Sequence, residues 1–162
     1  MKLLAATAVV LCALGGAAQA QQSGKLFFEG DLVRGAQPGA PGPFCVLSNQ
    51  FKRLEKVVWR VRVLDQSGKS LDGKGLKSLY VHLPDGTKLE GRFGPHPPPH
   101  LGKAEDHFWT SVWIVPDNYP SGSFVYKVVA TDLQGGTHTW EPFKSKTSQL
   151  TVIAGAIEIK SK

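Results

Sequence analysis

Residues 91–109, GRFGPHPPPHLGKAEDHFW, hold three of the five histidines of the chain beside four prolines. Imidazole and thiolate groups bind copper and zinc, so His96, His100 and His107, together with Cys45, form a candidate metal site. Two imidazole nitrogens must converge to about 2 Å from the same ion. The intervening prolines favour a polyproline II helix, in which four residues span roughly 12 Å and turn the flanking side chains apart. This geometry opposes chelation by His96 and His100 together.

Two interpretations of this loop therefore stay open. His107 lies on the far arm of the loop, where it would bind copper or zinc with His96 and a neighbour such as Asp106. A blue-copper centre usually has an axial methionine, and the single methionine of the chain is Met1. The second interpretation is a stiff loop at the rim of a β-fold, and the polyproline geometry favours it.

A second group of residues is suited to binding a partner. Arg60 and Arg62 lie on one face of a predicted strand, VVWRVRVLD, whose other face is apolar. We expect HFWTSVWIV to pair with it antiparallel, and Trp109 and Trp113 then face outward if Phe108 and its alternate neighbours face the core. Arginine is attracted to tryptophan rings, and both types are enriched in binding hot spots. Arg60, Arg62, Trp109 and Trp113 are therefore the expected binding surface.

The same pattern has two purely structural interpretations. In the first, the strand HFWTSVWIV has the opposite phase, so that Trp109 and Trp113 belong to the core. In the second, an N-terminal arm containing Leu26, Phe27 and Phe28 folds across the two tryptophans and buries them within the chain. The sequence does not choose among the three.

The first twenty residues predict export. Lys2 precedes an apolar run, and Ala18-Gln19-Ala20 is a small-x-small cleavage signal, which predicts a cut after Ala20. The run is too short to span a bilayer, and we expect no transmembrane segment elsewhere. Cleavage of 20 of the 162 residues leaves 142, enough for one domain, with a net charge of +5 instead of +6 because Lys2 is lost. We expect a periplasmic or secreted protein, and, without a run of like charges, no nucleic-acid partner.

Cleavage also removes Cys12, so the mature chain keeps Cys45 alone and forms no internal disulfide. A single cysteine in an oxidising compartment is a candidate for an intermolecular disulfide, a metal ligand or a reactive thiol. Phe44 and Val46 flank Cys45, and this setting favours a buried small apolar side chain instead.

The rest of the chain reads as short strands separated by turns. Strands are predicted at 26–33, 44–51, 57–65, 76–83, 87–93, 107–115, 123–132, 137–143 and 149–159, and no segment predicts a helix. Apart from the opening arm, seven to eight strands of this length indicate an all-β, antiparallel β-sandwich. The predicted organisation is a signal peptide over 1–20, an arm, Pro/Gly loop and edge strand over 21–50, a sandwich over 51–153, and a tail over 154–162.

Three motifs resemble those of bacterial immunoglobulin-like domains, of the macroglobulin and fibronectin-like kind. Phe51 with the strand VVWRVRVLDQSGKSL is similar to the opening F-x-x-G-E-x-V strand and D-x-x-G-x-x-L turn, with Leu54 at the glycine position. VHLPDG is similar to V-x-x-P-D-G, and IVPDNYPSGSFVYKVVATDLQG to the penultimate hairpin. The resemblance covers roughly residues 51–153. It implies an immunoglobulin-like sandwich that serves as a binding, spacer or assembly module without catalytic residues.

No nucleophile elbow, phosphate-binding loop or zinc-protease motif occurs in the chain. The leading hypothesis is a non-enzymatic accessory protein that needs no cofactor and binds an envelope or secreted protein, or a polysaccharide. The alternative is a periplasmic protein that handles copper or zinc through the histidine-rich loop.

Overall fold

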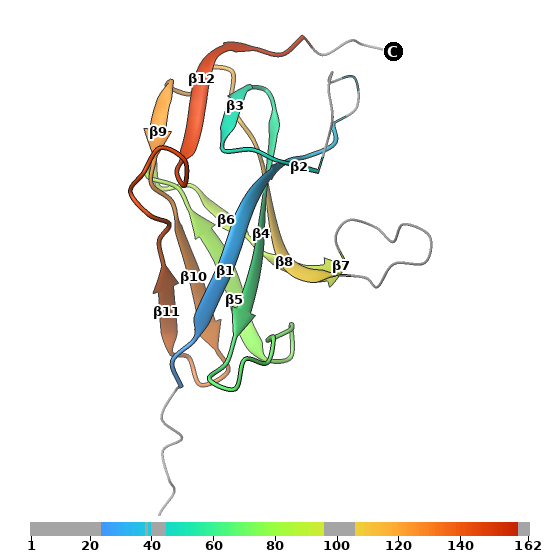
Figure 1. The fold of residues 1–162 in the computed structure, drawn as a ribbon, viewed down its shortest axis with the longest axis vertical. Coiled ribbons are helices and arrows are strands. Elements are labelled where there is room, and N and C mark those ends of the chain that lie inside the picture. The colour runs from blue at the N-terminus through green and yellow to red at the C-terminus, as the bar shows by residue number, and fades with distance from the viewer. Residues whose placement is uncertain (1–23, 38, 40–44, 96–105, 159–162) are drawn as a thin grey trace, which may run out of the picture.

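The computed structural model describes residues 24–37, 39, 45–95 and 106–158 (Figure 1). These residues contain strands and turns but no helix, which confirms the predicted all-β class. Accordingly, the described residues include no helix that is long and apolar enough to cross a membrane. The strands are β1 Phe27–Arg34, β2 Val46–Leu47, β3 Gln50–Arg53, β4 Lys56–Leu64, β5 Leu76–His82, β6 Lys88–Glu90, β7 Arg92–Pro95, β8 His107–Ile114, β9 Gly122–Phe124, β10 Lys127–Asp132, β11 Thr137–Trp140 and β12 Leu150–Ala156.

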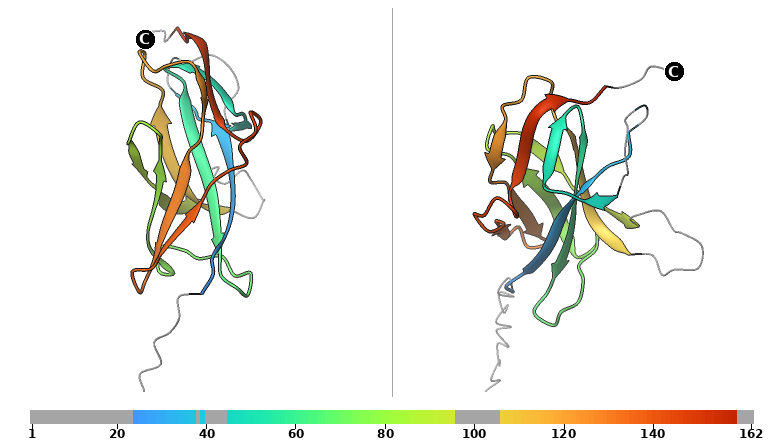
Figure 2. Two further views of the ribbon diagram at one scale, coloured as in Figure 1. Left: turned by 90° about the vertical axis from the view of Figure 1, so that its left-hand side faces the viewer. Right: turned by 45° about the horizontal axis from the view of Figure 1, so that its top comes forward.

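The strands form three sheets around one core. The five-stranded sheet has the order β2-β1-β4-β8-β7, the four-stranded sheet β11-β10-β5-β6, and the three-stranded sheet β3-β12-β9. All neighbours are antiparallel except β3 and β12, which run parallel. Figure 2 (right) shows β3, β9 and β12 together at one end of the molecule. This arrangement is consistent with a β-sandwich.

The strand β4 is the centre of the five-stranded sheet. Its apolar residues alternate with arginines, and the structure buries Trp59, Val61 and Val63 while Arg60 and Arg62 face outward. β4 pairs antiparallel with β8, as predicted, and on its other side with β1 along the whole of β1. The predicted strand 57–65 and the burial of its apolar face are confirmed.

Three predicted strands are divided between two sheets, and this is why the chain has more strands than expected. The prediction of one strand over 87–93 is wrong, because the chain leaves the four-stranded sheet after β6 and joins the five-stranded sheet as β7. The crossing occurs at Gly91, where a Cβ atom would lie 2.6 Å from the Leu79 side chain. The predicted strands 44–51 and 123–132 divide in the same way, into β2 and β3 and into β9 and β10.

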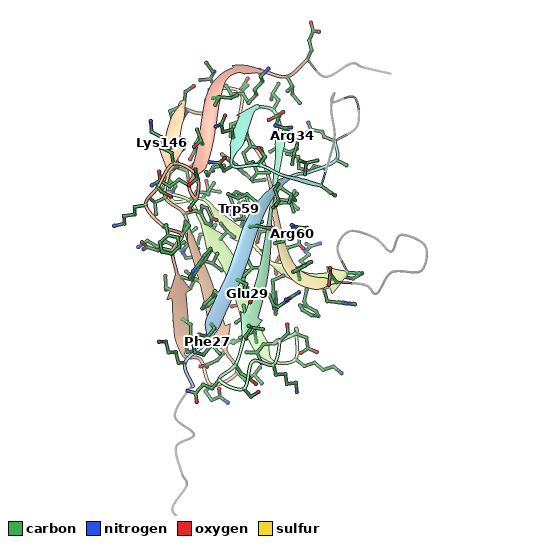
Figure 3. All side chains as sticks on the ribbon, viewed as in Figure 1. Phe27, Glu29, Arg34, Trp59, Arg60 and Lys146 are labelled. Atoms are coloured by element: carbon green, nitrogen blue, oxygen red, sulfur yellow. The ribbon has the colours of Figure 1, made fainter. Side chains whose placement is uncertain are left out.

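The core is rich in aromatic rings. Trp59 lies in the middle of the molecule (Figure 3), with its ring centroid 5.7 Å from that of Tyr126 and 6.4 Å from that of Trp113. Trp113 in turn contacts Tyr119 edge to face at 4.8 Å. Such tilted contacts suit the charge distribution of aromatic rings. Burial raises the pKa of the Tyr119 phenol to about 12, with a smaller contribution from Asp85.

Candidate functional site

The structure places Trp109 and Trp113 in the core, so the expectation that they face outward is wrong. Their exposed fractions are 5% and 8%, whereas Val112 and Ile114 on the other face of β8 are 49% and 47% exposed. β8 thus has the opposite phase to the one first expected, which was one of the two structural interpretations. The reason is tertiary: Trp113 packs between the Trp59 and Tyr119 rings.

The Trp109 side chain is fixed by two contacts. Its Nε1 donates a hydrogen bond to the Leu71 carbonyl over 2.8 Å, and its ring lies 5.7 Å from the ring of Phe93. The other structural interpretation, in which an N-terminal arm covers the tryptophans, is replaced by a different arrangement. Leu26 and Phe28 pack against the core, but they do so in and beside β1, which pairs with β4.

Arg60 and Arg62 do lie on the outer face of the five-stranded sheet, where each meets a carboxylate of β1. The Arg60 Nε donates to Asp31 over 2.8 Å, and a second guanidinium nitrogen contacts the other Asp31 oxygen. The hydrogen bond to Asp31 raises the pKa of Arg60. Arg62 pairs with Glu29 at 3.3 Å (Figure 3 labels Glu29 and Arg60).

Phe108 of β8 completes this face. The guanidinium carbons of Arg60 and Arg62 lie 5.5 and 5.3 Å from the centre of its ring, which is within cation–π distance. Phe108 therefore takes the place that the sequence analysis gave to the tryptophans. Arg60 and Arg62 thus each have a carboxylate of β1 and the Phe108 ring as partners.

The candidate metal site is only partly within the described residues, since His96 and His100 lie outside them. His107 begins β8, and its ring stacks on that of Phe93 at 5.8 Å.

Cys45 is free and half-buried, so the expected full burial is wrong. Its backbone N–H donates to the Arg34 carbonyl, and its φ of 56° is in the left-handed region. Among the described residues, no three His, Cys, Asp or Glu side chains are grouped closely enough to hold a metal ion.

A groove of about 430 Å³ lies between the edge of β1 and the chain that follows β11. On one side it is lined by β1 and the end of β2, and on the other by the segment 141–149 after β11, in which Figure 3 labels Lys146. The volume is within the usual range for ligand sites, about 300–1,000 Å³. The lining residues are Gly30, Asp31, Leu32, Leu47, Ser48, Asn49, Tyr126, Trp140, Pro142, Phe143, Thr147 and Ser148.

The floor of this groove is aromatic. Tyr126 is 2% exposed and contacts the Trp140 ring at 6.3 Å. Burial raises the pKa of the Tyr126 phenol, and the nearby Asp31 carboxylate adds to the shift. Trp140 lies directly under Gly30, where a Cβ atom would be 3.4 Å from its ring. The missing side chain of Gly30 thus lets the two sheet edges approach each other.

The rim of the groove is exposed and apolar. Phe143 is 84% exposed and Leu47 is 66% exposed, and these are the two highest values among the large exposed hydrophobic residues described. Asn49 holds the rim in place, because its Nδ2 donates to the Lys146 carbonyl and, at 3.4 Å, to the Gln149 carbonyl. The backbone carbonyl of Asn49 accepts a hydrogen bond from the Thr151 N–H at 2.7 Å.

An acid–histidine pair, Asp132 at the end of β10 and His138 in β11, joins the two strands across their turn. Asp132 is 7% exposed; one of its oxygens lies 2.9 Å from His138 Nε2, and the other accepts from the N–H groups of Gln134 and Gly136. The hydrogen bond to His138 is the main cause of the lowered pKa of Asp132, and the backbone N–H groups add to it.

This pair predicts a specific loss of stability in acid. Because the folded-state pKa of Asp132 is below its ordinary 3.8, the stabilisation is present above that value and is lost as the pH falls through the folded-state pKa. We expect Asp132→Asn to be less stable than wild type near neutral pH. We also expect its melting temperature to fall less than that of wild type between about pH 5 and about pH 2. Thermal melts monitored by circular dichroism test this. An equal acid-induced drop in both proteins would contradict it.

No prediction from the sequence concerned the groove. Its lining comes from four separated parts of the chain, around residues 30, 48, 126 and 145, so no local motif marks it. The one usable signal was Phe143, a single aromatic residue in the polar segment EPFKSKTS. No protein-family model matches the chain, and searches of the curated proteins and of the solved structures returned no significant match.

Proposed function

We propose that the protein is an exported, non-enzymatic binding module of the bacterial immunoglobulin-like kind, which holds an envelope protein or polymer in the groove beside β1. The observation that supports this most is the rim: Phe143 and Leu47 expose most of their apolar surface beside a recess with an aromatic floor. Large exposed apolar side chains next to polar groups are typical of interaction sites.

The immunoglobulin-like part of the proposal is supported by the backbone at Leu54. This residue stands at the glycine position of the opening motif, and its φ is 67°. Glycine is the residue that reaches this left-handed region without strain. The backbone at Leu54 therefore has the conformation that a glycine in the motif would favour.

Arg60, on the outer face of the five-stranded sheet, contributes to the proposed site indirectly. Asp31 lines the groove, and Arg60 fixes its carboxylate through a two-point contact across β1 and β4. Arg60 is thus a positioning residue for the groove.

A capture experiment tests the proposed function. Immobilised mature protein is exposed to an envelope extract of the source organism, and the retained protein and polysaccharide are quantified. We expect the double variant Leu47→Ser/Phe143→Ala to retain at least about tenfold less of the specific component, because hot-spot aromatic contacts contribute energies of that size. Both side chains are exposed, so the fold should be unaffected.

Leu133→Ser is the matched control, since Leu133 is 59% exposed on the β10–β11 turn and does not line the groove. We expect it to retain as much as wild type. Equal retention by wild type and the double variant, or no specific retention by wild type, would contradict the proposal.

A further inference from the structure

Among the described residues, no strand pairs with most of one edge of β1. This strand spans Phe27–Arg34 and pairs with β4 throughout, but on its other side β2 pairs only with Val33 and Arg34. The stretch Phe27–Leu32 therefore has a strand on one side alone. The other strands at the edges of the three sheets are four residues long or shorter in the part of the chain that the structure describes. Natural proteins usually keep such edges short or covered.

The peptide groups on this edge alternate in a defined way. The carbonyl of Leu32 accepts from the Ser48 N–H, and that of Arg34 from the Cys45 N–H, both on the β2 side. Gly35 N–H instead donates to the Lys56 carbonyl on the β4 side. In an antiparallel strand both polar groups of a residue point the same way, and the direction alternates along the chain. Phe28 and Gly30 thus direct their N–H and C=O groups to the unpaired edge.

This edge is also one lip of the groove. Gly30, Asp31 and Leu32 line the groove from β1, and Leu47 and Ser48 line it where the chain leaves β2. A strand added beside Phe27–Leu32 would continue the line of β2 and span roughly 20 Å at about 3.3 Å per residue. Its alternate side chains would enter the groove above Trp140 and beside Phe143. An exposed strand edge beside side-chain pockets is a recurring way to recognise extended peptides.

We infer that the groove binds an extended peptide segment of a partner protein, which pairs with the free edge of β1 as an added strand. The inference rests on the proposed function and names the class of its ligand. The lining favours an uncharged segment with apolar residues at alternate positions. Asp31 is the one charged side chain among the described lining residues, and it is already paired with Arg60. The alternating N–H and C=O groups of β1 match the regular spacing of peptide groups in an extended strand, which the hydroxyl groups of a polysaccharide do not reproduce.

Random twelve-residue peptides displayed on phage provide the probe. Peptides selected on mature wild-type protein are synthesised, and their binding is measured by fluorescence polarisation. We expect Kd values in the micromolar range, at least about tenfold weaker binding to Leu47→Ser/Phe143→Ala, and no change with Leu133→Ser. N-methylation of the peptide at successive positions should weaken binding at every second residue, because only alternate N–H groups face β1.

Gly30→Pro, compared with Gly30→Ala, tests the backbone contact: both variants add a Cβ beside the Trp140 ring, and only proline also removes the N–H. Proline removes the N–H of Gly30, which faces the free edge, and leaves the bonds of Glu29 and Asp31 to β4 in place. We expect at least about tenfold weaker binding of the selected peptides to Gly30→Pro than to Gly30→Ala. If Gly30→Pro does not fold, as judged by its melting transition, the exposed-rim double variant and the N-methylation pattern decide the question.

Three outcomes would overturn the inference. The selected peptides could bind the groove variants as well as they bind wild type, they could tolerate N-methylation at every position, or the selection could enrich no peptide. The capture experiment then separates the two proposals. If the groove retains a protease-resistant polymer, the proposed function holds and the peptide inference fails. If no retention depends on the groove, both the proposed function and the peptide inference fail.

Discussion

Replacing Trp59 with alanine is expected to lower the free energy of unfolding by about 3–5 kcal/mol, the range for large aromatic side chains in cores. Trp59 is 1% exposed, lies on the central strand β4, and contacts rings of both Trp113 and Tyr126. Its loss would leave a cavity at the junction of the two larger sheets, where rigid strands can collapse only partly. Urea denaturation followed by far-ultraviolet circular dichroism measures the change.

Trp59→Phe is the informative companion variant. The buried Nε1 of Trp59 has no hydrogen-bond partner among the described residues, and an unpaired buried donor costs about 1–3 kcal/mol. Phenylalanine removes that donor and keeps part of the ring contact, so we expect a much smaller loss than for alanine. A loss below about 1 kcal/mol for Trp59→Ala would show that the side chain is not a core residue.

Trp109→Ala is expected to have a comparable effect, about 3–5 kcal/mol, for a partly different reason. The variant loses the contact with Phe93 and also the hydrogen bond that joins β8 to the Leu71 carbonyl in the loop before β5. Trp109→Phe keeps most of the ring and isolates the hydrogen bond, which contributes about 0.5–1.5 kcal/mol. Urea denaturation gives both values, and faster proteolysis of the loop around Leu71 would report its release.

The matched control for Trp109→Ala is Val112→Ala on the opposite face of the same strand. Val112 is 49% exposed, so its truncation should cost less than about 1 kcal/mol. The reverse order, with Val112→Ala the more costly change, would mean that β8 has the phase first expected from the sequence.

The two central strands show how far alternation alone can be trusted. In β4 the charged residues Arg60 and Arg62 alternate with apolar ones, so only one face fits a core and the prediction succeeds. In β8 both faces carry large apolar residues, with Phe108 and Val112 on one and Trp109 and Trp113 on the other. Alternation then leaves the phase undetermined, and contacts with residues far along the chain, such as Leu71 and Tyr119, decide it.

The changes of sheet and the groove were beyond sequence reasoning for the same physical reason. The chain crosses between sheets at Gly91, where the backbone passes too close to Leu79 for a side chain. This contact between distant residues has no local sequence signature. The groove forms where the edge of β1 meets Trp140, over a hundred residues later, through the missing side chain of Gly30. Local patterns predicted the strand class and several turns, but strand edges acquire neighbours only through the complete topology.

The four tryptophans differ in their accessibility to solvent, and their fluorescence can therefore be told apart. Trp59, Trp109 and Trp113 are at most 8% exposed, whereas Trp140 is half-buried in the wall of the groove. A dissolved quencher such as acrylamide therefore reaches the indole of Trp140 far more readily than the other three. The native emission thus contains its own reporter of groove occupancy, free of any attached dye.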